Sequence, residues 1–305
     1  MGKIALLFAG QGAQYPGMGK DFYEQNPVAR EVFEKLEQQR LGTMQQCFTG
    51  SKEELSLTLN TQPCLFAVDY AIAKAVAEQA DLQVDAVAGF SLGEIPALAF
   101  AGLLDLEQAF ALVCRRAAVM QQAAEQHPGA MQAVLKLSAA RIIELAAPYS
   151  DVFPVNYNSP EQTAVAGKPE QLQAFAADVK AAGGRAVPLA VSGAFHSPYM
   201  DSAAAALADY MQTVTVQEGA CAVYANRTAQ PYTVAAAKAL IASQVNHPVQ
   251  WVKTIQHMLA DGVDCFIEVG PGKTLSGLVK KITADAQVYK VETMEDLAAL
   301  QQSRG

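Results

Sequence analysis

The segment from Asp85 to Leu98 constrains this chain more than any other, because it joins a short apolar strand pattern to an alanine-rich helical pattern through Gly-Phe-Ser-Leu-Gly at 89–93. A Gly-x-Ser-x-Gly sequence between a strand and a helix is typical of a nucleophile elbow, a sharp turn that raises a serine oxygen out of a sheet. The alternative is an ordinary turn flanked by glycines, which can have the same five-residue pattern. The pattern predicts an α/β fold in which Ser91 is a candidate nucleophile and the Leu92 N–H lies beside it as a donor.

The composition is that of a globular protein with a substantial core. Of 305 residues, 51% are hydrophobic and 17% are charged, and the net charge is −8 without any block of like charges. This acidic balance argues against nucleic acid or an anionic membrane as the main partner. The apolar run Ile4–Ala9 is too short to span a membrane and lacks signal-peptide flanks. Five dispersed cysteines predict a reducing, cytoplasmic location without disulfides or a metal site.

Strand and helix patterns alternate along most of the chain. Strand patterns lie at 3–9, 86–88, 220–225, 264–269 and 287–291, and the main helical patterns lie at 27–39, 51–59, 63–80, 105–126, 201–214, 233–245 and 293–302. This alternation predicts a large α/β-hydrolase-like domain with a parallel sheet, made of residues 1–126 and 192–305. The glycine-rich loop after the first strand would present Gln11 at the carboxyl edge of that sheet, where ligands bind in open α/β sheets.

Residues 127–191 have a different pattern. Strands are expected at 131–137, 152–157, 163–166 and 185–191, with helices at 138–148 and 169–182. The order βαββαβ is that of a split ferredoxin-like unit, and it is long enough to stand as its own subdomain. We therefore expect a small ferredoxin-like α+β subdomain inserted into the large domain.

The helix predicted over 105–126 contains two adjacent arginines with different expected environments. Its apolar stripe comprises Leu106, Ala109, Phe110, Val113, Ala117 and Met120. Arg116 lies roughly 50° from the centre of this stripe, whereas Arg115 lies about 150° away and is expected to be solvated. A half-buried guanidinium requires an anionic partner. That partner is either an internal carboxylate or a ligand, and a stem that reaches back to water is the remaining alternative.

A serine nucleophile needs a base, and the chain has four histidines. His127 lies in a turn and His257 on the polar face of a helix. His196 lies in a loop of small and aromatic residues, and elimination favours it, with His247 as the main rival. An α/β-hydrolase would also place an acidic residue between Ser91 and the histidine, and no acidic residue in that interval has a recognisable signature around it. Ordinary hydrolysis is therefore poorly supported.

Eight short motifs, taken in order, resemble the malonyl-CoA:acyl carrier protein transacylases and the related acyltransferase domains of polyketide synthases. The resemblance covers nearly the whole chain. The motifs are Phe8-Ala-Gly-Gln-Gly-Ala-Gln14, Thr61-Gln-Pro63, Gly89-Phe-Ser-Leu-Gly-Glu94, Leu112-Val-Cys-Arg-Arg-Ala-Ala-Val-Met-Gln121, Asn156-Tyr-Asn-Ser-Pro160, Gly193-Ala-Phe-His-Ser-Pro198, Pro248-Val-Gln-Trp251 and Glu268-Val-Gly-Pro-Gly-Lys273.

The resemblance implies a role for each matching residue. Ser91 would be the acylated nucleophile and His196 its general base. Gln250 would orient His196 through a carbonyl oxygen, so that no acidic residue is needed. Gln11 and the Leu92 N–H would form the oxyanion hole.

It also implies how the acyl group is selected. Arg116 would bind the free carboxylate of malonate in bidentate fashion and reject acetyl groups. The ring of Phe195 would crowd out an α-methyl group, and Met120 would complete the substrate site. No cofactor is expected to be bound. Malonyl-CoA would be the substrate, and acyl carrier protein would supply the phosphopantetheine thiol to a monomeric enzyme.

The implied activity is malonyl transfer from coenzyme A to acyl carrier protein, through a malonyl-serine, for fatty acid synthesis. The alternatives are a trans-acting acyltransferase that serves a polyketide or malonate decarboxylase carrier, and a serine hydrolase. Three residues depart from the family pattern: Phe90 stands at a usual histidine, Pro96 lies early in the elbow helix, and Ala117 replaces a common glycine beside Arg116.

Overall fold

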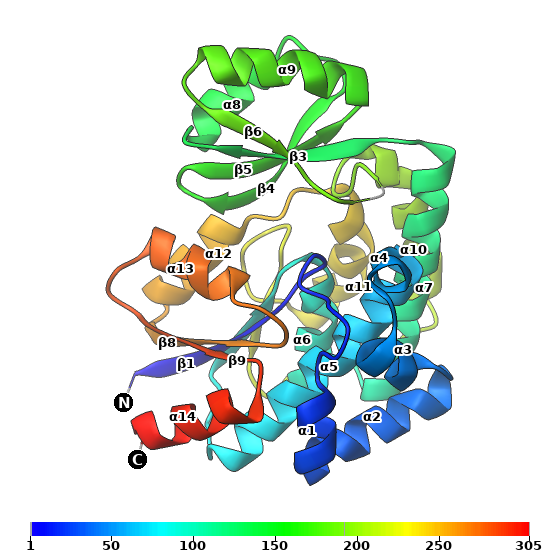
Figure 1. The fold of residues 1–305 in the computed structure, drawn as a ribbon, viewed down its shortest axis with the longest axis vertical. Coiled ribbons are helices and arrows are strands. Elements are labelled where there is room, and N and C mark those ends of the chain that lie inside the picture. The colour runs from blue at the N-terminus through cyan, green and yellow to red at the C-terminus, as the bar shows by residue number, and fades with distance from the viewer. Residues whose placement is uncertain (1, 192, 305) are drawn as a thin grey trace.

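The computed structural model describes residues 2–191 and 193–304 and has two separate sheets. The large sheet is entirely parallel, as expected, with the strand order β7-β2-β1-β8-β9. Its strands are β1 (Lys3–Phe8), β2 (Ala86–Gly89), β7 (Ala222–Tyr224), β8 (Val263–Val269) and β9 (Gln287–Val291). The small sheet lies above it in Figure 1.

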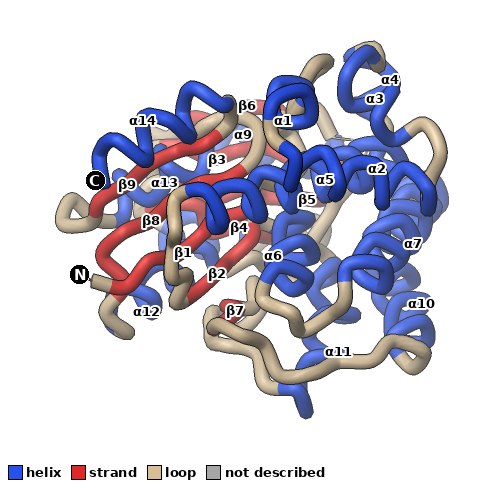
Figure 2. Tube along the Cα trace, turned by 90° about the horizontal axis from the view of Figure 1, so that it is seen from below, coloured by secondary structure: helices blue, strands red, loops and turns tan. Residues whose placement is uncertain are grey.

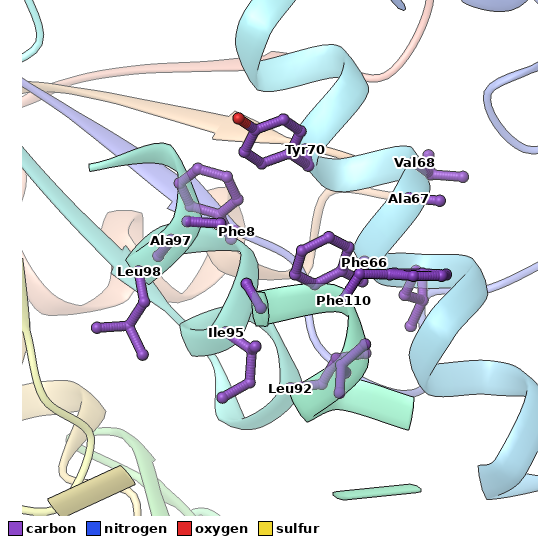
Figure 3. Packing of buried hydrophobic residues seen from close by; sticks show 14 of the residues in the cluster. Phe8, Phe66, Ala67, Val68, Tyr70, Leu92, Ile95, Ala97, Leu98 and Phe110 are labelled. Carbon is purple, nitrogen blue, oxygen red and sulfur yellow. The ribbon is translucent and has the colours of Figure 1, made fainter. Parts of the chain in front are cut away.

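Helices cover both faces of the large sheet, which explains why β1 is apolar at consecutive positions. Leu6 and Phe8 pack into one core cluster, and the intervening Leu7 packs into another. The first cluster contains residues of α5 (Thr58–Gln79), α6 (Glu94–Phe100) and α7 (Leu106–Gln126), and the second contains residues of α12 (Trp251–Ala260) and α13 (Thr274–Ile282). Figure 3 shows part of the first cluster, where Phe8 and Leu92 lie close to side chains of α5 and α7.

The remaining helices surround this core, as Figure 2 shows. They are α1 (Lys20–Gln25), α2 (Pro27–Gln39), α3 (Thr43–Thr49), α4 (Lys52–Ser56), α10 (Asp201–Met211), α11 (Val234–Ser243) and α14 (Met294–Arg304), with short 3₁₀ turns η1 (Ser91–Gly93), η2 (Pro198–Met200) and η3 (Gln244–Asn246). The α2 helix has the predicted bounds. The short helices α1 and α3 were not predicted, because one or two turns carry little periodicity. Within the described residues, no helix is both long and apolar enough to cross a membrane.

The small sheet is antiparallel, with the strand order β4-β5-β3-β6. Its elements are β3 (Ala130–Leu135), α8 (Ala139–Ala146), β4 (Val152–Ser159), β5 (Gln162–Gly167), α9 (Pro169–Ala181) and β6 (Arg185–Pro188). The helices α8 and α9 cover one face and share a core with it. β6 ends at Pro188, three residues before its predicted end, because its ladder with β3 stops at the Gln132–Pro188 pair. Residue 192, where we expected the chain to return to the large domain, lies outside the described residues.

Candidate active site

The elbow at Ser91 is built on two very close backbone approaches. A Cβ atom at Gly89 would lie 1.8 Å from the carbonyl carbon of Gly93, and one at Gly93 would lie 2.3 Å from the Phe8 oxygen. Ser91 itself has a φ of 53°, a left-handed conformation that is strained for a residue with a side chain. The Asn226 side chain accepts a hydrogen bond from the Ser91 N–H at 2.7 Å. The turn thus holds Ser91 where β2 ends and α6 begins.

His196 faces Ser91 directly, with Nε2 2.7 Å from Oγ. The imidazole is buried, and its Nδ1 lies 3.0 Å from the Gln244 carbonyl oxygen and 3.2 Å from that of His247. Since both neighbours of Nδ1 are acceptors, Nδ1 carries the hydrogen, and Nε2 has a lone pair to accept the Ser91 proton. Two backbone carbonyls thus orient the ring in place of an acidic side chain.

The expectation that Gln250 orients His196 is wrong. The Gln250 N–H donates to the Asn226 oxygen at 2.8 Å, and the Gln250 oxygen accepts from the Thr254 N–H and hydroxyl at 2.9 and 3.1 Å. Gln250 precedes α12, so its carbonyl is engaged in starting that helix. The turn η3, six residues earlier, supplies the carbonyl of Gln244 instead.

The ring of His247, the rival candidate for the base, is engaged by other residues. Its Nδ1 lies 2.8 Å from the Ser243 oxygen and 2.8 Å from the Asn246 side-chain oxygen. The contribution of His247 to the site is its backbone carbonyl oxygen, which lies 3.2 Å from His196 Nδ1. The structure therefore brings His196, and not the ring of His247, to the nucleophile.

Burial and the nearby Arg116 charge lower the pKa of His196 to about 4. A lowered pKa means that the imidazole is neutral, and therefore able to act as a base, above about that pH. We expect the rate of Ser91 acylation by a neutral acyl thioester to fall at acid pH with a midpoint near pH 4, and not near the pH of 6.5 typical of an exposed histidine. Single-turnover acylation by acetyl-CoA between pH 3.5 and 7 measures this midpoint, and a midpoint near 6.5 would contradict it.

Arg116 lies beside the nucleophile and is only 2% exposed, whereas Arg115 is exposed, as the helical stripe predicted. Its Nη1 donates to Gln62 Oε1 at 2.6 Å. Its Nη2 donates to Gln244 Oε1 at 2.8 Å and to Ser91 Oγ at 3.2 Å. Nε has no partner among the described residues. The guanidinium is thus fixed by two amides and directed at Ser91.

Glu94 is a buried carboxyl near this centre that sequence reasoning missed. Its Oε1 accepts from the Tyr232 hydroxyl, and its Oε2 accepts from the Gln244 amide at 2.9 Å and the Asn226 N–H at 3.2 Å. Burial raises the pKa of Glu94 to about 7, against the opposing effect of these hydrogen bonds and of Arg116. Its place one residue after the elbow was the only signal in the sequence, and its partners come from distant segments.

A cleft of about 290 Å³ opens at Ser91 between the two sheets. On the side of the large sheet it is lined by Gln11, Phe90, Ser91, Met120, Phe195 and His196, and on the side of the small sheet by Met131, Ala133, Asn156, Asn158, Gln162 and Ala164. Besides Ser91, four of the predicted site residues line this cleft: Gln11, Met120, Phe195 and His196. Leu92 follows Ser91 with its side chain buried in the core.

Phe90, which departs from the family pattern, packs edge-on against Trp251 with ring centroids 5.4 Å apart. Phe90 also lines the cleft. An aromatic contact with α12 therefore replaces whatever polar contact a histidine would make there.

The geometry of the site defines a class of enzyme. A serine at a cleft, bonded to a buried neutral histidine and contacted by a fixed guanidinium, is suited to covalent transfer of an acidic acyl group. The chain belongs to the acyl transferase domain family, whose model matches residues 5–300. The resemblance found in the sequence is thereby confirmed.

Individual relatives agree over nearly full length. The malonyl CoA-acyl carrier protein transacylase of Bacillus subtilis is 35% identical over 97% of this chain and 96% of the relative, and that of Haemophilus influenzae is 36% identical over 99% of each. The crystal structure of the transacylase from Clostridium perfringens superimposes with a TM-score of 0.94 at 36% identity, covering 99% of this chain and 97% of that one. Another match is found in the solved complex of a type II polyketide acyl-carrier protein with its malonyl-transacylase. The TM-score is 0.94 at 32% identity, covering 99% of this chain and 99% of the matched chain.

Proposed function

We propose that this protein transfers a malonyl group from malonyl-CoA to the phosphopantetheine thiol of acyl carrier protein, through a malonyl ester on Ser91, for fatty acid synthesis. The observation that carries the proposal is that Ser91 Oγ contacts both a base and a cation, His196 Nε2 at 2.7 Å and Arg116 Nη2 at 3.2 Å. The relatives named as malonyl CoA-acyl carrier protein transacylases support it.

In the first half-reaction, Ser91 Oγ attacks the thioester carbonyl of malonyl-CoA while His196 Nε2 accepts its proton. The Leu92 N–H and the Gln11 side chain donate to the oxyanion; Gln11 lies at the cleft, and its amide is 3.4 Å from the Thr58 hydroxyl. The carbon–sulfur bond then breaks, and His196 gives the proton to the sulfur. Coenzyme A leaves as the thiol.

In the second half-reaction, the phosphopantetheine thiol gives its proton to His196 and attacks the ester carbon. The carbon–oxygen bond breaks and Ser91 recovers the proton. The cleft would hold the pantetheine arm in place of water, which limits hydrolysis of the ester. No cofactor and no metal ion enters either half.

The malonyl carboxylate would take the place that Ser91 Oγ holds against Arg116. Gln62 and Gln244 fix the guanidinium plane, so a carboxylate can meet two parallel N–H groups without reorganising the arginine. Phe195 and Met120 line the cleft nearby and would limit the size of the group beside the carboxylate.

We also propose an α/β-hydrolase-like large domain (1–126 and 192–305) with a ferredoxin-like insertion (127–191). The antiparallel order β4-β5-β3-β6 with the connection βαββαβ supports the ferredoxin-like assignment. A monomer in the cytoplasm completes the proposal, and the cytoplasmic location is supported by the five cysteines, which are free.

A pulse-chase experiment tests the proposed function. The enzyme is incubated with radiolabelled malonyl-CoA, freed of nucleotide, and mixed with holo acyl carrier protein of fatty acid synthesis, with apo carrier as the control. We expect stable label on the enzyme that moves to the holo carrier only. Rapid release of free malonate without labelled carrier would show a hydrolase. Label that moves only to a polyketide or malonate decarboxylase carrier would overturn the fatty acid assignment.

A further inference from the structure

Arg116 and Glu94 form a buried pair of opposite charges joined through one amide. Arg116 Nη2 donates to Gln244 Oε1 at 2.8 Å, and Gln244 Nε2 donates to Glu94 Oε2 at 2.9 Å. All three side chains are at most 2% exposed. In the free enzyme the carboxylate of Glu94 thus balances the guanidinium without touching it.

The groups that face Glu94 from other elements are mostly neutral. The Gln244 amide comes from η3 and the Asn226 N–H from the loop after β7. Tyr232, before α11, donates its hydroxyl, and burial together with Glu94 raises the pKa of Tyr232. Arg116 of α7 is the cation that acts on Glu94, and α5 adds only the neutral Gln62 to Arg116. The His196 ring, held neutral above about pH 4, meets the backbone of Gln244.

A second anion disturbs this balance. When a malonyl carboxylate pairs with Arg116, one buried cation faces two carboxylates in a site that excludes water. Like charges in low-dielectric surroundings raise one another's pKa, and the group with the weaker contact to the cation takes up the proton. The malonyl carboxylate would contact Arg116 directly, whereas Glu94 reaches it only through Gln244.

We propose that Glu94 takes up one proton from solvent when the malonyl carboxylate binds Arg116, so that loading of malonyl, unlike loading of a neutral acyl group, is coupled to protonation. This inference rests on the proposed function. The balance is simple: the serine proton leaves on coenzyme A, the thioester becomes an ester, and Glu94 gains a separate proton from water. Glu94 then acts as a positioning residue that sets the charge of the acyl site.

Burial places the pKa of free Glu94 near 7, so the coupling falls in an accessible pH range. Above that pH the free enzyme has lost the proton that the malonyl-enzyme retains. The loading equilibrium for malonyl should therefore fall by about 16-fold between pH 7 and 8.5, and loading at pH 8 should take up about 0.9 proton per malonyl group. Acetyl loading should show neither effect.

Glu94→Gln is a closely matched variant. Its amide oxygen can accept from the Asn226 N–H and the Gln244 amide, as Oε2 does now. Its NH₂ group can donate to the Tyr232 oxygen once that hydroxyl turns round. The hydrogen bonds around residue 94 are therefore kept, and only the titratable carboxyl group is removed. Arg116 also loses its counter-charge, so malonyl loading at pH 8.5 should be about 30-fold more favourable in Glu94→Gln than in the wild type.

The experiment measures the equilibrium between acyl-CoA and acyl-enzyme from pH 6 to 8.5 with radiolabelled malonyl-CoA and acetyl-CoA, for wild type and Glu94→Gln. Both reactions release the same thiol, so its ionisation cancels in the ratio of the two equilibria. An indicator dye in weakly buffered solution reports proton uptake by the wild type directly, which does not depend on the variant folding.

We expect the ratio of malonyl to acetyl loading to fall with pH in the wild type and to stay constant in Glu94→Gln. A constant ratio in the wild type without proton uptake would overturn the inference and leave the proposed function intact. A falling ratio that persists in Glu94→Gln would assign the proton to another group and also overturn it. Failure of the wild type to form a malonyl-enzyme at any pH would overturn the proposed function and the inference together.

Discussion

Replacement of His196 by alanine is expected to slow the acylation of Ser91 by about 1,000-fold, for malonyl-CoA and acetyl-CoA alike. The reason is that Ser91 Oγ has His196 Nε2 as its proton acceptor at 2.7 Å, and the adjacent Arg116 guanidinium can only donate. Single-turnover labelling of the enzyme, followed by acid quench, measures this rate.

His247→Ala is the matched control, since this histidine offers its backbone carbonyl, and not its ring, to His196. Alanine keeps that carbonyl, so acylation should stay within about threefold of the wild-type rate. Loss of acylation in His247→Ala with activity retained in His196→Ala would refute the assignment of the base. Melting temperatures of both variants show whether either change alters the fold.

Arg116→Ala should reduce malonyl loading by about 100-fold or more and leave acetyl loading within about fivefold of the wild type. The variant removes the only charged donor that the described residues place at Ser91, and it leaves Gln62 and Gln244 without their cation. A malonyl carboxylate would then be buried without a counter-charge, whereas an acetyl group has no charge to compensate. Parallel loading assays with the two thioesters give the selectivity ratio.

The neighbouring Arg115→Ala removes the same positive charge from the exposed face of α7 and should leave the ratio unchanged. Equal losses of malonyl and acetyl loading in Arg116→Ala would refute a role in carboxylate recognition. A second readout is independent of loading affinity: since Arg116 lowers the pKa of His196, its removal should move the acid limb of acetyl loading to higher pH.

Local patterns in the sequence were sufficient to predict those structural features that depend on residues close together in the chain. The helical angle between Arg115 and Arg116 predicted one solvated and one half-buried side chain; Arg115 is exposed, and Arg116 is buried more completely than predicted. The glycines around Ser91 predicted a strand, a sharp turn and a helix, because the close approach of Gly89 to Gly93 occurs within five residues, although Gly93 also approaches the distant Phe8 oxygen. The parallel sheet and the separate antiparallel sheet followed from the change of pattern near residue 130.

The partners of the site could not be predicted, because they depend on contacts between distant segments. Gln62 and Gln244 lie 54 and 128 residues from Arg116, and no periodicity relates them to it. Gln250 was chosen from a motif match, whereas the turn η3 brings the carbonyl of Gln244 to His196. Glu94 resembled an ordinary acidic residue in the first turn of a helix until its burial was known.

The two walls of the cleft come from different segments of the chain. Ser91, His196, Arg116 and the side chains that bond to them lie outside 127–191, whereas Met131, Asn156 and Gln162 of the far wall lie inside it. Substitutions in the far wall can therefore change the shape of the cleft without replacing any side chain that bonds to Ser91, His196 or Arg116.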